Sequence, residues 1–190
     1  MISFAKIRKK NEKSILFPNF VNRHHILMDP MKIKNIEFFL TEYETIEELN
    51  ANDQRLTREA INATQNSYAP YSHFQVGAAV LLQNGKIISG TNQENAAYPS
   101  GLCAERTAVF YANSQYPDQA ITTLAIAASN EKGLTPMPIS PCGACRQVLI
   151  ESEERYQHPI RLILYGTKKI YSIKNSQILL PLSFVDKSME

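Results

Sequence analysis

The sequence predicts an α/β fold, a layered sandwich whose mixed sheet has five strands. Three observations favour it. Apolar runs typical of strands alternate with helical patterns through the second half of the chain. The dipeptide Asn84-Gly85 separates two apolar runs, as in a tight hairpin. The 190 residues, 44% hydrophobic and 20% charged, can bury one sizeable core, so we expect a single domain over 31–190.

Two helices are expected before the first strand. Apolar residues recur at helical spacing over 36–49 and again over 53–68. Asn52 or Asp53 can cap the second helix, and Pro70 ends it.

The five predicted strands contain mainly apolar residues. They span about 74–82, 86–91, 121–129, 160–166 and 168–173. The uninterrupted apolar run from Ile121 indicates burial on both faces. Gly77, Ala78 and Ala79 are small for a strand, which fits either close helix packing or room for a ligand against the backbone.

Helices are expected between the later strands. One spans about 104–114, and another begins near Cys142 and ends near Glu154. A short helical turn over 177–180 is stopped by Pro181.

Basic charge gathers in residues 1–30, which carry a net +4 and leave −2 for the rest of a chain of net charge +2. We expect either a flexible basic tail, with His24 and His25 solvated, or translated upstream sequence if the native start is Met31. The near-neutral total argues against a dedicated nucleic-acid binder. No apolar run matches a secretory signal or a membrane span, so we expect a cytoplasmic protein without a membrane partner.

The chain has three cysteines: Cys103, Cys142 and Cys145. An odd number without an export signal favours metal binding or catalysis over disulfides. The C-x-x-C pair alone also suits a redox or structural zinc site, but three thiolates with an open fourth position are typical of catalytic Zn²⁺. His73 and His158 could supply a fourth ligand, yet neither lies at short spacing from a cysteine, so each is expected to be an ordinary loop or strand-end residue.

The residues after Cys103 suit such a site. Three thiolates on Zn²⁺ leave a net charge of −1, which opposes ionisation of a bound water. Helix N-termini aim partial positive charge and N–H groups at the sulfurs, and Arg106 adds a full charge within one turn. Glu105 is close enough to move a proton from that water, although a glutamate in a first helical turn is favourable there anyway.

Cys103-Ala104-Glu105 followed by Pro141-Cys142-Gly143-Ala144-Cys145 resembles the signature of the zinc-dependent nucleoside deaminases. Within that group it resembles specifically the small, homotetrameric type of cytidine deaminase. Four segments match in order and cover most of residues 52–185: YAPYSHFQVGAAVL, NQENAAYPSGLCAERTA, SPCGACRQVL and LLPLSF.

The resemblance implies a three-layer α/β/α sandwich with one zinc ion per subunit, held by the three cysteines. It also implies hydrolysis of cytidine and 2′-deoxycytidine to uridine and 2′-deoxyuridine, a pyrimidine salvage reaction that releases ammonia. Zinc-activated water attacks C4, and Glu105 carries protons between the water, N3 and the leaving amine.

The resemblance assigns the ribose hydroxyls to Asn92 and Glu94, and the i, i+2 spacing at a strand end supports a shared face. Phe74 packs against the pyrimidine, although an apolar core residue is the alternative without the family match.

The base edge is likewise assigned by resemblance. It faces Glu105 and the Ala104 N–H, while the Ser140 carbonyl meets the exocyclic amine. Tyr98 and Phe184 complete the site of a neighbouring subunit in the homotetramer.

Other functions remain open at this point. A nucleic-acid deaminase usually begins its signature with histidine and needs a basic channel. A nucleotide deaminase needs a cation near the 5′ end of the sugar, which the sequence does not place. In a zinc-stabilised binding module Glu105 would be dispensable, and a thioredoxin-like protein would not need Cys103. The sequence does not decide between ribose and deoxyribose, or whether modified cytosines are accepted.

Overall fold

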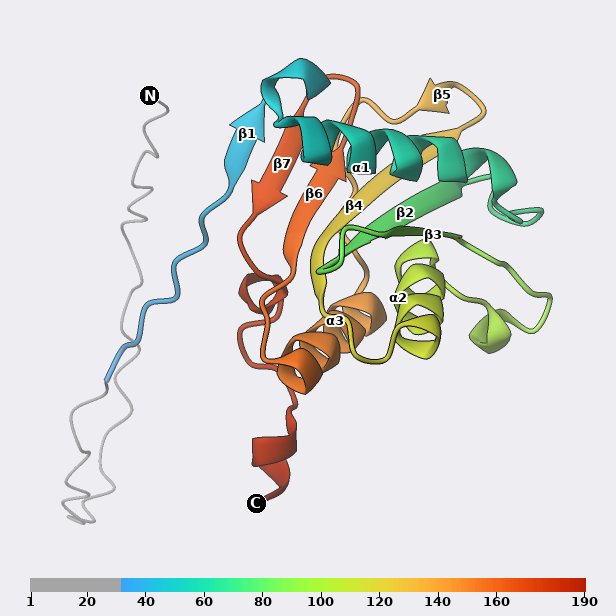
Figure 1. Ribbon diagram of the computed structural model, residues 1–190. Helices are drawn as coiled ribbons and strands as arrows, with labels where there is room; N and C mark the ends of the chain where they lie inside the picture. Colours follow the sequence, from blue (N-terminus) through green and yellow to red (C-terminus); the bar gives the residue numbers. More distant parts are fainter. Residues whose placement is uncertain (1–31) are drawn as a thin grey trace, which may run out of the picture. The chain divides into compact units, whose positions relative to one another are not determined.

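A mixed sheet runs through the computed structural model, which describes residues 32–190 (Figure 1). Six strands lie in the order β1-β7-β6-β4-β2-β3, and β5 pairs with β4 beside this path. The expectations for residues 1–30, His24 and His25 included, lie outside the described residues. The strands are β1 (Thr41–Tyr43), β2 (Gln75–Leu82), β3 (Ile87–Thr91), β4 (Ile121–Asn130), β5 (Gly133–Leu134), β6 (Arg161–Tyr165) and β7 (Ile170–Ile173).

The α/β class and the mixed sheet are confirmed, but the expected strand number of five is two too low. The expected strands are present as β2, β3, β4, β6 and β7. The additional ones, β1 and β5, have only three and two residues. Strands this short carry too little periodic pattern to be recognised in sequence.

The helix expected over 36–49 is wrong. Thr41–Tyr43 forms β1 and pairs antiparallel with β7, and Ile46–Glu48 makes a single 3-10 turn. The apolar residues that suggested a helix face are not buried together, since Ile36 and Phe39 are 65% and 67% exposed. Backbone pairing with the sheet edge outweighs local helix preference here.

Three helices sandwich the sheet (Figure 1). They are α1 (Ala51–Ala63), α2 (Ala104–Gln115) and α3 (Gly143–Tyr156). Short 3-10 turns occupy Thr64–Asn66, Tyr98–Ser100, Ser176–Leu179 and Asp186–Met189. One core cluster joins Leu56 and Ala60 of α1 to the sheet, and another joins Ala108 of α2 and Leu149 of α3 to its opposite face. The layers are therefore α/β/α, as expected.

Two glycines let the helices approach the strands closely. A Cβ on Gly77 would lie 2.1 Å from the Ala60 carbonyl oxygen of α1, and a Cβ on Gly90 would lie 2.4 Å from the Ala108 nitrogen of α2. At Gly77, close helix packing is therefore the explanation that the structure supports.

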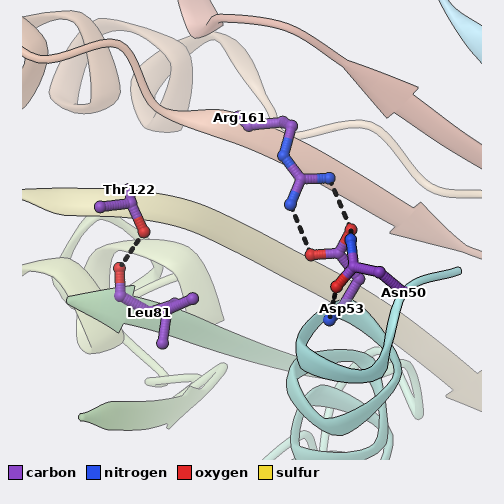
Figure 2. A network of polar contacts seen from close by, with 5 residues as sticks. All are labelled: Asn50, Asp53, Leu81, Thr122 and Arg161. Carbon is purple, nitrogen blue, oxygen red and sulfur yellow. Dashed lines mark hydrogen bonds and ion pairs between the residues drawn. The ribbon is translucent and has the colours of Figure 1, made fainter. Parts of the chain in front are cut away.

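A polar cluster ties the start of α1 to the sheet (Figure 2). The helix is capped by Asn50, not by Asn52 or Asp53, because the Asn50 Oδ1 accepts the Asp53 N–H at 3.1 Å. The nearly buried Asp53 carboxylate accepts two hydrogen bonds from the Arg161 guanidinium of β6 and one from the Asn50 amide. Figure 2 also shows the Thr122 hydroxyl, which donates to the Leu81 carbonyl at 3.1 Å and joins β4 to β2.

The chain path brings two helix N-termini to one edge of the sheet. Strands β3 and β4 are both antiparallel to β2 and hence parallel to each other, and β4 is parallel to β6. The connection from β3 to β4 contains α2, the connection from β4 to β6 contains α3, and both move in the same direction across the sheet. Because such connections between parallel strands share one handedness, both helices lie on the same face of the sheet. Both helices begin beyond the carboxyl ends of parallel strands, where ligand sites of α/β proteins lie.

Within residues 32–190, no helix is both long and apolar enough to cross a membrane.

Candidate metal centre and substrate cavity

The three cysteine sulfurs meet where α2 and α3 begin. Cys103 is the N-cap residue of α2, Cys142 is the N-cap residue of α3, and Cys145 is buried in the first turn of α3. The Cys142 Sγ lies 3.7 Å from the Cys103 Sγ and 3.6 Å from the Cys145 Sγ, and all three lie within 4.8 Å of one another.

This spacing fits a zinc ion. Zn–S bonds of about 2.3 Å in a tetrahedron place sulfurs about 3.8 Å apart. Among residues 32–190, only these three side chains form a cluster able to hold a metal ion, so His73 and His158 are not part of it. Three thiolates then leave the fourth position for a water or substrate, as in catalytic zinc sites.

Arg106 stands beside the sulfurs, as expected. Its Nη2 lies 3.7 Å from the Cys103 Sγ and 3.4 Å from the Gly101 carbonyl oxygen. The neighbouring Cys145 thiol and the Arg106 guanidinium lower the pKa of Cys103 to about 5. Hydrogen bonding with Cys103, together with burial, raises the pKa of Cys145. The Arg106 guanidinium thus favours the ionised form of the Cys103 thiol that it contacts.

Glu105 lies in the first turn of α2 and is 5% exposed. Burial raises its pKa, and the nearby Cys103 sulfur adds to the effect. A carboxyl group whose pKa is shifted toward neutrality is suited to accept and return a proton.

A cavity of about 640 Å³ opens beside the sulfurs, a volume typical of small-molecule sites. It brings together most of the residues that the sequence nominated. These are Phe74, Asn92, Glu94, Tyr98, Ala104, Glu105, Arg106 and Ser140, with Cys103 and Cys142. Phe184 does not line it; its side chain is 62% exposed, and its carbonyl accepts a hydrogen bond from the Gln147 amide.

The Asn92 amide is held by the protein around it. Its Oδ1 accepts the Val76 N–H at 2.7 Å and the Ser67 hydroxyl, and its Nδ2 donates to the Phe74 carbonyl at 2.9 Å. These backbone partners fix the positions of the amide oxygen and nitrogen. The Nδ2 therefore keeps one N–H available to a ligand.

Glu94 is held in the same way by the loop before β2. It accepts the N–H groups of Tyr71 at 2.9 Å and Ser72 at 3.2 Å, and the Ser72 hydroxyl as well. The Ser72 hydroxyl bond, followed by the Tyr71 N–H, lowers the pKa of Glu94. The carboxylate therefore stays ionised and accepts hydrogen bonds only.

Sequence reasoning missed Ser67, Ser72 and Arg146. Serines in loops carry no pattern that distinguishes them. Arg146 offered one signal, a cation in the first turn of a helix, where the helix dipole disfavours positive charge.

A family model of the cytidine and deoxycytidylate deaminase zinc-binding region matches residues 50–157. The chain belongs to the cytidine and deoxycytidylate deaminase family. Among curated relatives, the cytidine deaminase of Halalkalibacterium halodurans is 47% identical over 98 residues, which are 52% of this chain and 70% of that protein. The cytidine deaminase of Mycobacterium tuberculosis is 40% identical over 109 residues, which are 56% of this chain and 77% of that protein.

Solved structures agree with the family assignment. A crystal structure of cytidine deaminase from Burkholderia pseudomallei matches with a TM-score of 0.58 and 35% identity, covering 68% of this chain and 97% of that one. The resemblance predicted from the sequence is thereby confirmed, and the matched zinc-binding region contains the three clustered cysteines that can hold the ion.

Proposed function

We propose that this family member catalyses the zinc-dependent hydrolysis of cytidine and 2′-deoxycytidine to uridine and 2′-deoxyuridine, with release of ammonia, in cytoplasmic pyrimidine salvage. Residues 31–190 act as one catalytic domain. The observation that carries the proposal is one cavity lined by two cysteines of the three-thiol cluster, a buried glutamate and two sugar-binding candidates. The curated relatives named cytidine deaminases support the substrate.

The role of each side chain in the reaction follows from its position in the site. Cys103, Cys142 and Cys145 hold the zinc ion, which when bound would lower the pKa of a water molecule. Arg106 offsets the surplus negative charge of the thiolates through its contact with Cys103. Glu105 accepts a proton from the attacking water, passes it to N3 of cytosine and helps protonate the leaving amine.

The nucleoside is oriented from two sides. Asn92 offers its one free N–H, and Glu94 its carboxylate, to the ribose hydroxyls. Phe74 packs against the pyrimidine ring. The Ala104 N–H with Glu105 and the Ser140 carbonyl meet the base edge.

A nucleoside fits the cavity better than a nucleotide. Among its lining residues in the described part of the chain, Arg106 is the only basic one, and it already contacts Cys103. A 5′-phosphate would therefore find no free cation on the part of the cavity wall that these residues of one chain provide.

The active enzyme is a homotetramer with shared sites. Phe184 and Tyr98 are 62% and 76% exposed, which leaves both aromatic side chains available to a neighbouring subunit. Phe184 lies outside the cavity of its own chain and is free to close the cavity of a neighbour. Dilution should therefore abolish activity in step with dissociation; full activity of the separated chains would refute shared sites.

The deciding experiment follows the loss of cytosine absorbance with cytidine, deoxycytidine or cytidine monophosphate, with and without a chelator. Turnover of the nucleosides alone, abolished by the chelator and restored by zinc, is expected. Turnover of the monophosphate at an equal rate would contradict the nucleoside assignment, and chelator-resistant turnover would contradict the zinc mechanism.

A further inference from the structure

Arg146 follows Cys145 in the first turn of α3, where a cation is unfavourable on dipole grounds. The side chain is only partly exposed. A half-buried guanidinium in this place requires hydrogen-bond acceptors to compensate for it.

Two backbone carbonyls supply that compensation. The Arg146 Nε donates to the Pro141 carbonyl at 2.9 Å, and the Nη1 donates to the Leu179 carbonyl at 2.9 Å. The first carbonyl belongs to the peptide that enters Cys142, and the second ends the 3-10 turn Ser176–Leu179. Since the guanidinium is planar and rigid, it fixes these two peptides relative to each other.

The next residue binds the same C-terminal part of the chain. The Gln147 Nε2 donates to the Phe184 carbonyl at 2.7 Å. Residues 176–184, which we call the C-terminal brace, are therefore fastened to the helix turn that carries two zinc ligands. Their own start is fixed at the other end of α3, where the buried Glu153 carboxylate accepts the Ser176 N–H at 2.8 Å.

We propose that Arg146 is a positioning residue that couples the C-terminal brace to the zinc-binding turn. By holding the Pro141–Cys142 peptide, it fixes the Cys142 sulfur and the adjacent Ser140 on the cavity wall. This inference rests on the proposed function for its substrate effects, but its effect on zinc retention does not require turnover.

The test compares Arg146→Met, which keeps the apolar stem without donors, with Arg146→Lys, which keeps the charge on a single donor nitrogen. Arg55→Gln, on an exposed arginine of α1, controls for the loss of charge. The readouts are the rate of zinc transfer from the full-length protein to a coloured chelator, and KM and kcat for cytidine. We expect Arg146→Met to release zinc roughly tenfold or more faster, in line with the usual effect of removing groups that orient metal ligands. KM should rise more than kcat falls, Arg146→Lys should be intermediate, and Arg55→Gln should match the unmodified chain.

Hydrogen exchange provides a measurement that needs no substitution. Coupling between two sites is reciprocal, so removal of zinc should speed exchange at the brace amides of Ile178 and Leu180 relative to those of β4. If Arg146→Met does not fold, Arg146→Lys and this measurement carry the test.

Zinc release and KM unchanged in Arg146→Met would overturn the coupling, as would an equal effect of Arg55→Gln. Unchanged brace exchange after zinc removal would also overturn it. If the unmodified protein retained zinc but did not deaminate cytidine, the proposed function would fail while the zinc-release comparison still decided the coupling.

Discussion

Gly90→Ala tests how closely α2 and β3 must pack to form the metal centre. The added Cβ would lie 2.4 Å from the Ala108 nitrogen and 2.7 Å from the Ala104 carbonyl oxygen, both backbone atoms of α2. To reach an ordinary contact of 3.4 Å, the helix must retreat by about 1 Å. The backbone of a helix cannot move aside as a flexible side chain would. The loss in the free energy of unfolding should therefore lie at the upper end of overpacking effects, about 3 kcal/mol.

The same shift should reach the zinc site, because Cys103 caps the displaced helix. Its sulfur lies 3.7 Å from the Cys142 Sγ on α3. Metal–ligand distances tolerate deviations of only about 0.2 Å, so a movement near 1 Å should weaken zinc binding.

The assay is thermal unfolding together with zinc content. We expect Gly90→Ala to lower the Tm by roughly 6–12 °C and to bind zinc more weakly. Ser89→Thr, which adds one methyl on the opposite, exposed face of β3, should leave both unchanged. A Gly90→Ala protein with normal Tm and zinc affinity would show that the close helix contact does not shape the site.

Three further substitutions separate chemistry, stability and substrate binding. Glu105→Gln should retain zinc, by metal analysis, while kcat falls about 100- to 10,000-fold, since the proton carrier is lost; near-normal turnover would remove Glu105 from the mechanism. Asp53→Asn should lower the free energy of unfolding, measured in urea, by about 1–3 kcal/mol and leave the zinc content unchanged. The loss is smaller than for a fully buried ion pair because Arg161 is 34% exposed. Equal stability would show that the pair is not stabilising. Asn92→Ala should raise KM about tenfold or more, because the ligand N–H and the bond that holds the Phe74 carbonyl are both removed; an unchanged KM would refute its sugar role.

The sequence predicted most of the regular elements, since each carried a local pattern. The helices at Cys103 and Cys142 and the hairpin at Asn84-Gly85 lie where expected, within a few residues. The failure over 36–49 has a physical cause, because β1 exists through pairing with β7, a strand more than 120 residues away. Such pairing leaves no trace in the periodicity of either segment.

The residues of the site, like the elements of the fold, could be predicted only where a local sequence pattern exists. Zinc-ligand chemistry could be inferred from three cysteines, and charge compensation from Arg106, because both follow from residue type and spacing. The hydroxyls of Ser67 and Ser72, which fix Asn92 and Glu94, could not be inferred, since they depend on how a loop folds back on a strand end.

The meeting of Cys103 and Cys142, 39 residues apart, follows from strand order and not from either motif. If the connections β3–α2–β4 and β4–α3–β6 had run in opposite directions across the sheet, their common handedness would have placed α2 and α3 on opposite faces. The order β6-β4-β2-β3 instead makes both steps run the same way, so two helix N-termini open side by side beyond the carboxyl ends of β3 and β4. Each contributes free N–H groups and partial positive charge to the same point, which is what a cluster of thiolates needs. Topology therefore supplies the electrostatic environment that the motifs require, and Arg106 adds a full positive charge beside Cys103.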